Sequence, residues 1–414
     1  MTDTGTGLRD EVLRAYRDHV SIGMAQLSRM MRATVETRSE GPYVWDEAGE
    51  RYLDCGGYGV FTLGHCHPRV VDAVVEQVRT LPLSTRLLLN GALAEAADAL
   101  VRVAPDGLER VYFGVSGADV VEVALKLARL NGRRRVVAME NGYHGKSLGA
   151  LSVTGRAVYR DPFEPLLADI EFVPFGDADT LRSALASGPE ACVLLEPVQA
   201  EAGVIVPPEG YLAEVERTCR EHGAFLVVDE IQTGLGRLGA WWGVDREGVT
   251  PDVLLAGKAL GGGVVPVGAL LATEEAFDRL SRDPLLHNST FSGSPIAMAA
   301  VRAAVEVIEE EGIVERAGAL GTVIRDRVAA ALHEACPALV RDVRGVGLLI
   351  GIEWTVDFLS LDFLLEMLDR RVVIAHSMNA PAVSRLTPPA VLTEADVDLI
   401  EEAVRASGAA MVTR

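Results

Sequence analysis

The sequence predicts an α/β protein in which a large domain with a mostly parallel, seven-stranded sheet is joined to a smaller α+β domain. Two observations lead to this prediction. In the middle of the chain, short apolar runs alternate with amphipathic segments that have helical spacing. In the last third, long helical patterns are followed by short, separate strands. Alternation of strand and helix is typical of a doubly wound sheet, whereas the pattern of the last third is typical of an α+β unit.

The seven expected strands are rich in valine and leucine on both faces, as in strands that are buried between two layers of helices. They span Arg110–Val115, Arg135–Met139, Ile170–Pro174, Ala191–Leu195, Phe225–Val228, Val253–Ala256 and Val267–Ala272. Between them, Asp119–Leu130 and Glu209–His222 have the clearest helical pattern. Each is followed by a glycine that favours the end of a helix, at Gly132 and Gly223 respectively.

Further elements are expected on both sides of this core. The helices lie at Leu8–His19, Pro295–Glu311 and Val314–Cys336, and the strands near Val340–Val343, Leu348–Trp354 and Val372–Ile374. Tyr43–Trp45 and Arg51–Leu53 flank Asp46–Gly49, which is the pattern of a hairpin. We therefore expect three parts: an N-terminal segment (1–70) that joins the small domain, a large domain (71–300) and a C-terminal small domain (301–414).

The net charge of −20 argues against nucleic acid or an anionic membrane as the main partner, because both require a basic surface. The five cysteines are an odd number and none of them form a Cys-x-x-Cys pair, so a reducing compartment fits better than a disulfide framework. Residues 1–12 lack the apolar core of a signal peptide, and no apolar run is long enough to cross a bilayer. We therefore expect a cytoplasmic protein without a nucleic-acid or membrane partner.

Four short features each follow an expected strand. They are the turn Ser116-Gly117-Ala118, the loop that contains Tyr143 and His144, the carboxylate of Asp229, and Lys258, which precedes three consecutive glycines. Ligands of open α/β sheets bind at the carboxyl ends of the strands, so these features are expected to converge. Taken singly, each has an ordinary alternative: a tight turn, a buried loop with a hydrogen-bonded histidine, a carboxylate that caps a loop, and a surface lysine.

Together, the four features supply the groups that bind pyridoxal phosphate (PLP). A turn that opens a helix presents backbone N–H groups to a phosphate, and Tyr143 can stack on a planar ring. Asp229, at the end of an apolar run, needs a buried partner such as a protonated pyridinium nitrogen. Lys258 lies where a desolvated amine is suited to form a Schiff base. Lys258 and Asp229 are thus the expected catalytic residues.

Two other motifs are assigned to structure rather than to a cofactor or a metal. Gly234-Leu235-Gly236-Arg237-Leu238-Gly239 matches the spacing of a dinucleotide-binding loop, but the helix that such a loop must open is not expected after it. His65-Cys66-His67 lacks a second pair of ligands at a spacing typical of zinc sites. We therefore expect neither a Rossmann site nor a metal site.

Several longer motifs follow one another along nearly the whole chain. They are Val44-Trp45-Asp46, Gly64-His65-Cys66-His67-Pro68, the helix Glu122–Arg129, Glu196-Pro197-Val198-Gln199, Asp229-Glu230-Ile231-Gln232-Thr233-Gly234, Gly257-Lys258-Ala259-Leu260, Ser289-Thr290-Phe291 and Arg385-Leu386-Thr387-Pro388-Pro389. With these motifs, the chain resembles the class III aminotransferases of the ornithine and acetylornithine type, which are PLP enzymes of fold type I. The resemblance implies a transaminase that works by a ping-pong mechanism.

The resemblance also implies how the cofactor is bound. Gly117 and Ala118 would bind its phosphate, and Tyr143 would stack on its ring. Asp229 would pair with the pyridinium nitrogen, and Gln232 would lie near the ring hydroxyl.

Further residues are implied to bind the substrate or the second subunit. Thr290 would reach the phosphate of the other subunit's cofactor, so that the active unit would be a homodimer. Glu201 and Arg385 would form a switchable pair that frees Arg385 for the carboxylate of an amino acid. Tyr58 matches a position that lines the substrate pocket.

The chain departs from the family pattern at three positions. Ala118 stands where threonine or serine is usual, so one hydroxyl contact to the phosphate is missing, and Asp119 stands where glutamate is usual. Lys146 replaces an arginine that often binds a substrate carboxylate. Lys146 occurs instead in the putrescine (diamine) aminotransferases, which the chain also resembles in Gly56–Phe61, Gly145–Ser152 and Pro162–Leu167.

We therefore expect a transaminase that moves an amino group between a terminal (omega) amine, such as a diamine, and a 2-oxo acid, such as 2-oxoglutarate. Three alternatives stay within PLP chemistry: an ornithine or acetylornithine type of substrate, an aldehyde on a large specialised-metabolite scaffold, and another reaction such as decarboxylation, epimerisation or a mutase step. A binding or scaffold protein without catalysis is a fourth, and the presence of Lys258 and Asp229 counts against it.

Overall fold

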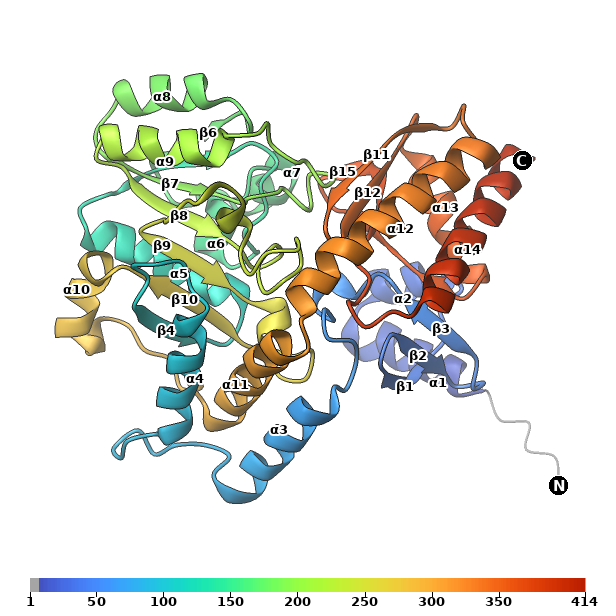
Figure 1. Ribbon diagram of the computed structural model, residues 1–414, viewed down its shortest axis with the longest axis horizontal. Coiled ribbons are helices and arrows are strands. Elements are labelled where there is room, and N and C mark those ends of the chain that lie inside the picture. The colour runs from blue at the N-terminus through green and yellow to red at the C-terminus, as the bar shows by residue number, and fades with distance from the viewer. Residues whose placement is uncertain (1–6, 414) are drawn as a thin grey trace.

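The computed structural model describes residues 7–413, in which a large α/β domain lies beside a smaller domain (Figure 1). The large domain contains a seven-stranded sheet with the strand order β4-β10-β9-β8-β7-β5-β6. Its strands are β4 (Arg110–Gly114), β5 (Arg135–Met139), β6 (Ile170–Val173), β7 (Ala191–Leu195), β8 (Phe225–Asp229), β9 (Val253–Ala256) and β10 (Gly268–Ala272). Each expected strand is present to within one residue at either end, and the predicted fold class is confirmed.

One strand of this sheet runs against the others. β10 pairs antiparallel with both β4 and β9, whereas β5, β6, β7, β8 and β9 pair in parallel. Successive side chains of a strand point to opposite faces of the sheet. In β5, Val137 and Met139 accordingly belong to one apolar cluster, and Val136 and Ala138 belong to another. Both faces of the sheet are therefore buried, which explains why its strands lack a polar face.

The helices of the large domain come mainly from the segments between the strands. They are α3 (Pro68–Thr80), α4 (Gly91–Arg102), α5 (Gly117–Leu130), α6 (Leu148–Ser152), α7 (Ala157–Arg160), α8 (Ala178–Ala186), α9 (Tyr211–Glu221), α10 (Glu274–Arg282) and α11 (Pro295–Glu310). The helix that was expected from Asp119 begins at Gly117, because the hydroxyl of Ser116 accepts a hydrogen bond from the N–H of Asp119 and caps the helix (3.2 Å).

The smaller domain combines an antiparallel sheet with three helices. The sheet has the order β11 (Val340–Val346), β12 (Leu349–Trp354), β15 (Ala380–Leu386) and β14 (Ala375–Ser377). The helices are α12 (Ile313–Ala335), α13 (Phe358–Asp369) and α14 (Glu394–Val412). A further sheet joins the N-terminal strands β1 (Glu36–Glu40), β2 (Tyr43–Asp46) and β3 (Arg51–Asp54) to β13 (Val372–Val373). The blue N-terminal elements therefore lie against the red C-terminal ones (Figure 1).

The N-terminal region differs from the single helix expected over Leu8–His19. Helix α1 (Leu8–Ala15) continues as a π-helical turn (Tyr16–Val20) and is followed by α2 (Ile22–Met30). The expectation about a signal peptide concerns residues 1–12, of which 1–6 lie outside the described residues. Within residues 7–413, no helix has the length and apolar character needed to span a membrane.

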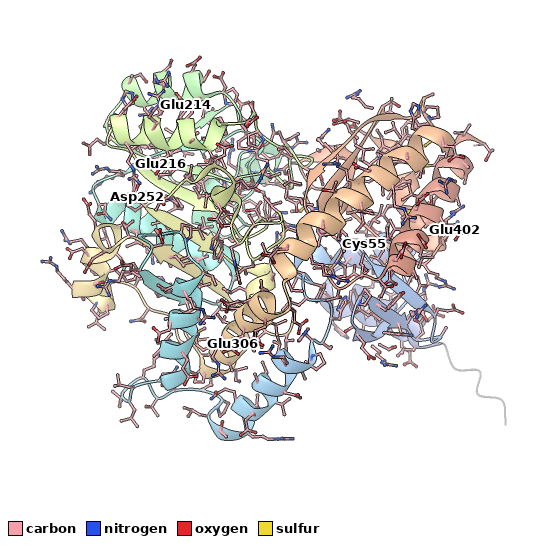
Figure 2. The ribbon with its side chains drawn as sticks, in the orientation of Figure 1. Cys55, Glu214, Glu216, Asp252, Glu306 and Glu402 are labelled. Atoms are coloured by element: carbon pink, nitrogen blue, oxygen red, sulfur yellow. The ribbon has the colours of Figure 1, made fainter. Side chains whose placement is uncertain are left out.

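Acidic side chains lie on helices of both domains, in keeping with the net charge of −20. Figure 2 labels Glu214 and Glu216 on α9, Glu306 on α11 and Glu402 on α14.

Candidate active site

A cavity of about 250 Å³ opens at the carboxyl ends of the large domain's strands. The residues that line it follow β4, β5, β7, β8 and β9. They are Ser116, Gly117, Ala118, Tyr143, His144, Gly145, Lys146, Glu196, Ala200, Glu201, Asp229, Ile231, Gln232 and Lys258. Nine of the twelve residues that the sequence predicts for the site are among them, so the structure brings the four features of the sequence together.

One wall of the cavity is the start of helix α5. The first turn of a helix has backbone N–H groups without helical partners, which favours the binding of an anion. Gly117 packs closely on Ile231, because a Cβ atom at Gly117 would lie 2.8 Å from Ile231 Cδ1. The methyl group of Ala118 faces Gly145, where an added Cβ would lie 2.8 Å from Ala118 Cβ. The cavity is therefore narrow at this end.

A buried carboxylate lies at the end of β8. Oδ2 of Asp229 is 2.7 Å from Nδ1 of His144, and Oδ1 accepts a hydrogen bond from the N–H of Ile231 (3.0 Å). Burial alone would lower the pKa of His144, but the hydrogen bond and the charge of Asp229 outweigh it and raise that pKa. His144 is therefore stabilised in its charged form beside Asp229.

Lys258 lines the same cavity, at the start of a 3₁₀ turn (Lys258–Gly261). Its backbone has a φ angle of 46°, which is unusual for a residue with a side chain and is typical of functional sites. Burial, with a smaller contribution from the charge of Arg385, lowers the pKa of its amine to about 8, although Glu201 and Asp229 act in the opposite direction. A larger fraction of the amine is therefore neutral, and nucleophilic, than in an ordinary lysine.

Glu196 also lines the cavity, and no role was predicted for it from the sequence. Its Oε1 accepts a hydrogen bond from the N–H of Tyr143 (3.0 Å), and burial raises its pKa to about 7. The signal for it was present in the sequence, because Glu196 directly follows an apolar strand in the same way that Asp229 ends one.

The third acidic group, Glu201, pairs with an arginine of the smaller domain. Nη1 of Arg385, on β15, lies 2.7 Å from Oε1 of Glu201, and both side chains are buried. Oε2 of Glu201 accepts a hydrogen bond from the N–H of Met378 (2.9 Å). Burial would raise the pKa of Glu201, but the positive charge of Arg385 and the Met378 N–H outweigh it and lower that pKa. Glu201 therefore neutralises Arg385 at the boundary between the two domains.

Lys146 lines the cavity, but its ammonium group lies on an aromatic ring. The Nζ atom is 4.2 Å from the ring centroid of Tyr159, which is a cation–π contact. The hydroxyl of Tyr159 donates a hydrogen bond to the carbonyl oxygen of Met378 (3.0 Å). Tyr159 was not predicted as a site residue, since nothing in its local sequence distinguishes it from other surface tyrosines.

The glycine-rich motif after β8 positions a buried arginine. The motif forms a series of turns rather than the start of an α-helix, and a short 3₁₀ helix follows at Gly243–Glu247. Arg237, which is 1% exposed, donates hydrogen bonds to the carbonyl oxygen of Pro388 (2.6 Å) and to Oγ1 of Thr62 (2.9 Å). Burial and the nearby charge of Arg385 lower the pKa of Arg237 to about 10. The motif thus connects the large domain to the N-terminal segment and to the smaller domain.

The two histidines of the motif His65-Cys66-His67 have separate partners. Nε2 of His65 lies 2.9 Å from Oδ2 of Asp54, whereas Nε2 of His67 lies 3.2 Å from Oε1 of Glu311. The motif therefore joins two different parts of the chain.

Three predicted residues do not line this cavity within a single chain: Arg385, which contacts the cavity residue Glu201, and also Tyr58 and Thr290. Tyr58 is 74% exposed and does not line it. Thr290 lines a separate pocket of about 440 Å³, together with Leu88, Leu89 and Phe291. The expectation that Thr290 acts on another subunit's cofactor is compatible with this position, since the two pockets share no residue.

The groups of the cavity fit PLP. Both polar atoms of the Gln232 side chain are buried without a hydrogen-bond partner, as expected beside an absent polar ligand. The start of α5 suits a phosphate, the carboxylate of Asp229 suits a ring nitrogen, and the amine of Lys258 suits an aldehyde. These residues would therefore hold the cofactor, which when bound supplies an aldehyde for the substrate amine and a ring that accepts electrons.

Comparison with known proteins gives one family. Residues 24–406 match the family model described as Aminotransferase class-III. The ornithine aminotransferase from Toxoplasma gondii, whose structure has PLP in partial occupancy at its active site, is 30% identical, with a TM-score of 0.87 over 97% of this chain and 98% of that chain. The ornithine aminotransferase from Plasmodium yoelii is 29% identical, with a TM-score of 0.78 over 91% and 93% of the two chains. A thermostable omega transaminase engineered for the synthesis of bulky amines is 25% identical, with a TM-score of 0.86 over 94% and 96%.

Proposed function

The chain belongs to the class III aminotransferases, which depend on PLP, and we propose that it transfers amino groups between a terminal amine, such as a diamine, and a 2-oxo acid, such as 2-oxoglutarate. The single observation that carries this proposal is the contact of the Lys146 ammonium with the ring of Tyr159, 4.2 Å from its centroid. A lysine held in this way presents no planar fork to a distal carboxylate, which an arginine would do.

In this proposal, Lys258 and Asp229 perform the catalytic steps. Lys258 would hold the cofactor through its amine, and the same amine, when free, would move the proton that leaves the substrate carbon. Its lowered pKa supports this role, because the amine must be neutral to accept the proton. Asp229 would pair with the protonated ring nitrogen of the cofactor, and His144 holds the carboxylate of Asp229 in place.

Glu201 and Arg385 let one cavity accept two kinds of substrate. When an amine without a carboxylate binds, Glu201 stays paired with Arg385 and the cation is neutralised. When the 2-oxo acid binds, Glu201 turns away and Arg385 binds its carboxylate. The distance of 2.7 Å between the two charged groups supports the closed state of this pair.

The distal end of a diamine is a second ammonium group, which requires an acceptor. Glu196 lines the cavity and can supply a carboxylate oxygen, whereas Glu201 stays paired with Arg385 in this state. The contact with Tyr159 keeps the charge of Lys146 to one side, and together these features support a substrate with a cationic far end.

A second candidate is an ornithine type of substrate. The likeness to ornithine aminotransferases at 30% and 29% identity favours it, and such a substrate requires a binding site for its α-carboxylate during the amine half-reaction. In that case a cation other than the paired Arg385, such as Lys146, would have to bind the α-carboxylate in the amine half-reaction.

We further propose that the active unit is a homodimer in the cytoplasm. A run of exposed leucines, Leu87, Leu88 and Leu89, lies beside the pocket that contains Thr290. If a second copy of the chain covers this apolar surface, Thr290 of one copy would lie near the phosphate of the PLP bound by the other copy.

The test is a panel of amines with the purified holoenzyme. Putrescine, ornithine and 4-aminobutyrate are compared by kcat/KM with 2-oxoglutarate as acceptor, in the native protein and in Lys146→Arg. We expect putrescine to lead in the native protein, and ornithine and 4-aminobutyrate to gain about tenfold in the variant, because a bidentate contact replaces a point charge. If ornithine or 4-aminobutyrate leads in the native protein, the diamine proposal is wrong.

A further inference from the structure

A continuous series of contacts joins Lys146, which lines the cavity, to Arg385, which pairs with the cavity residue Glu201. The ring of Tyr159 lies under the ammonium of Lys146, and its hydroxyl donates to the carbonyl oxygen of Met378. The N–H of the same residue, Met378, donates to Oε2 of Glu201. Oε1 of Glu201 in turn pairs with Arg385. The four distances, in this order, are 4.2 Å from Nζ of Lys146 to the ring centroid of Tyr159, and then 3.0, 2.9 and 2.7 Å between the paired atoms.

The turn that contains Met378 is fixed to the large domain at further points. The N–H of Asn379 donates to the carbonyl oxygen of Glu201 (2.9 Å), and its side-chain amide donates to the carbonyl oxygen of Asn141 (2.8 Å). These bonds use backbone atoms of the large domain. The hydrogen bond from Tyr159 differs from these bonds, because Tyr159 connects the turn to the side chain of Lys146, which lines the cavity.

We propose that Tyr159 is a positioning residue that sets the state of both cations: its ring holds Lys146 to one side, and its hydroxyl holds the turn that keeps Glu201 paired with Arg385. This inference rests on the proposed use of the Glu201–Arg385 pair. Because Oε2 of Glu201 is bound by Met378 and Oε1 by Arg385, the carboxylate can release Arg385 only when it also leaves the Met378 N–H. Tyr159 thereby opposes the binding of carboxylates and favours amines.

The consequence is a change in preference rather than a loss of activity. Without the hydroxyl, the turn is held less firmly, Glu201 leaves Arg385 more readily, and a carboxylate binds more tightly. Without the ring, the ammonium of Lys146 is also free to approach a carboxylate. A residue that only stabilised the fold would weaken the binding of every ligand alike.

The experiment measures the binding of glutarate to the holoenzyme by calorimetry. Glutarate is a dicarboxylate that has no amino or oxo group, so it binds without reacting. The variants are Tyr159→Phe, which removes the hydroxyl, and Tyr159→Leu, which removes the ring as well. Glu201→Gln gives the affinity of an unmasked Arg385. Tyr211→Phe is the matched control, because its hydroxyl contacts Met139 in the core of the large domain (3.6 Å).

We expect Tyr159→Phe to lower the Kd of glutarate by about threefold to tenfold, the effect of one hydrogen bond, and Tyr159→Leu to lower it further. Tyr211→Phe is expected to match the native protein. An unchanged Kd in Tyr159→Phe, beside a lower Kd in Glu201→Gln, would overturn the role of the hydroxyl. Equal values for Tyr159→Phe and Tyr159→Leu would overturn the role of the ring.

The amine panel judges the proposed function separately. If the native protein transfers no amino group while the glutarate series behaves as expected, the proposed function fails and the coupling through Tyr159 stands. If the native protein is an active transaminase and Glu201→Gln leaves glutarate binding unchanged, the pair does not mask Arg385 and the inference is overturned.

Discussion

Nδ1 of His144 lies 2.7 Å from Oδ2 of Asp229, and both residues line the cavity that also contains Lys258. The other carboxylate oxygen is held by the N–H of Ile231. Both oxygens of Asp229 are thus fixed by the protein itself, and the carboxylate needs no rearrangement when a cationic ring binds. Preorganised charge of this kind is the largest single contribution to catalysis in many enzymes.

Asp229→Asn tests this arrangement directly. The amide has nearly the same shape but lacks the negative charge, so we expect the single-turnover rate with an amine to fall roughly 100-fold or more, while PLP binding weakens far less. Stopped-flow absorbance measures the first quantity, and cofactor dissociation measures the second. Asp252→Asn is the control, since Asp252 accepts a backbone hydrogen bond from Leu226 outside the cavity. A large loss of PLP affinity with unchanged single-turnover chemistry would contradict the assignment.

The lowered pKa of Lys258 predicts how cofactor attachment depends on pH. The neutral amine is the nucleophile, so attachment of PLP to the apoprotein is expected to speed up as the pH rises towards about 8, where the amine loses its proton, and to level off above that value. With an ordinary lysine, whose pKa is 10.5, the attachment of PLP would continue to speed up above pH 8.

The measurement is trapping with borohydride, followed by peptide mapping. The chain has only three lysines, Lys126, Lys146 and Lys258, so the modified position is identified without ambiguity. We expect the label on Lys258 alone and no label in Lys258→Ala, which also loses turnover. A label on Lys146, or near-native turnover in Lys258→Ala, would show that the lysine is wrongly assigned.

The missing hydroxyl at Ala118 predicts that cofactor affinity can be improved. The methyl group of Ala118 faces Gly145, so the smaller serine is expected to fit better than threonine. Ala118→Ser is expected to slow PLP release about fivefold, which corresponds to one hydrogen bond of about 1 kcal/mol. Ala118→Thr is expected to gain less, because its extra methyl group meets the backbone at Gly145. Release is followed by the absorbance of the free cofactor, and faster release from the serine variant would mean that another group already fills this position.

Thr290 offers a test of the dimer that does not depend on a structure of it. Subunits that carry Lys258→Ala are mixed with subunits that carry Thr290→Val. In a hybrid dimer, the cavity with the intact Lys258 receives the intact Thr290 from the other subunit. We therefore expect the hybrid to contain one site with native PLP affinity, whereas the Thr290→Val homodimer releases PLP several-fold faster. If Thr290 acts within its own subunit, the hybrid contains no native site and the proposed arrangement is wrong.

Most of the fold was predictable because its strands are buried on both faces. The apolar runs that contain Val137 and Val193 have no polar alternation, and this identifies a covered sheet without any knowledge of its neighbours. Other elements gave weaker signals. Helices α3 and α4 were not predicted, and the antiparallel direction of β10 depends on its two partners rather than on its own sequence.

The residues of the candidate site likewise differ in how clearly the sequence indicates them. Lys258, Asp229 and the turn at Gly117 each follow a strand, and the geometry of a parallel sheet brings such residues to one edge. Glu196 shares this signal and was overlooked.

By itself, the sequence determined the strands, the residues at their carboxyl ends and hence the class of cofactor, because burial and chain direction act locally. Only the tertiary structure decided which further groups meet. Tyr159 contacts Met378 across 219 positions of the chain, and no motif of the sequence implies this contact. The pair of Glu201 and Arg385 spans 184 positions and was implied by the family resemblance alone. Such contacts depend on how the smaller domain packs against the large one, and no local pattern of residues specifies that packing.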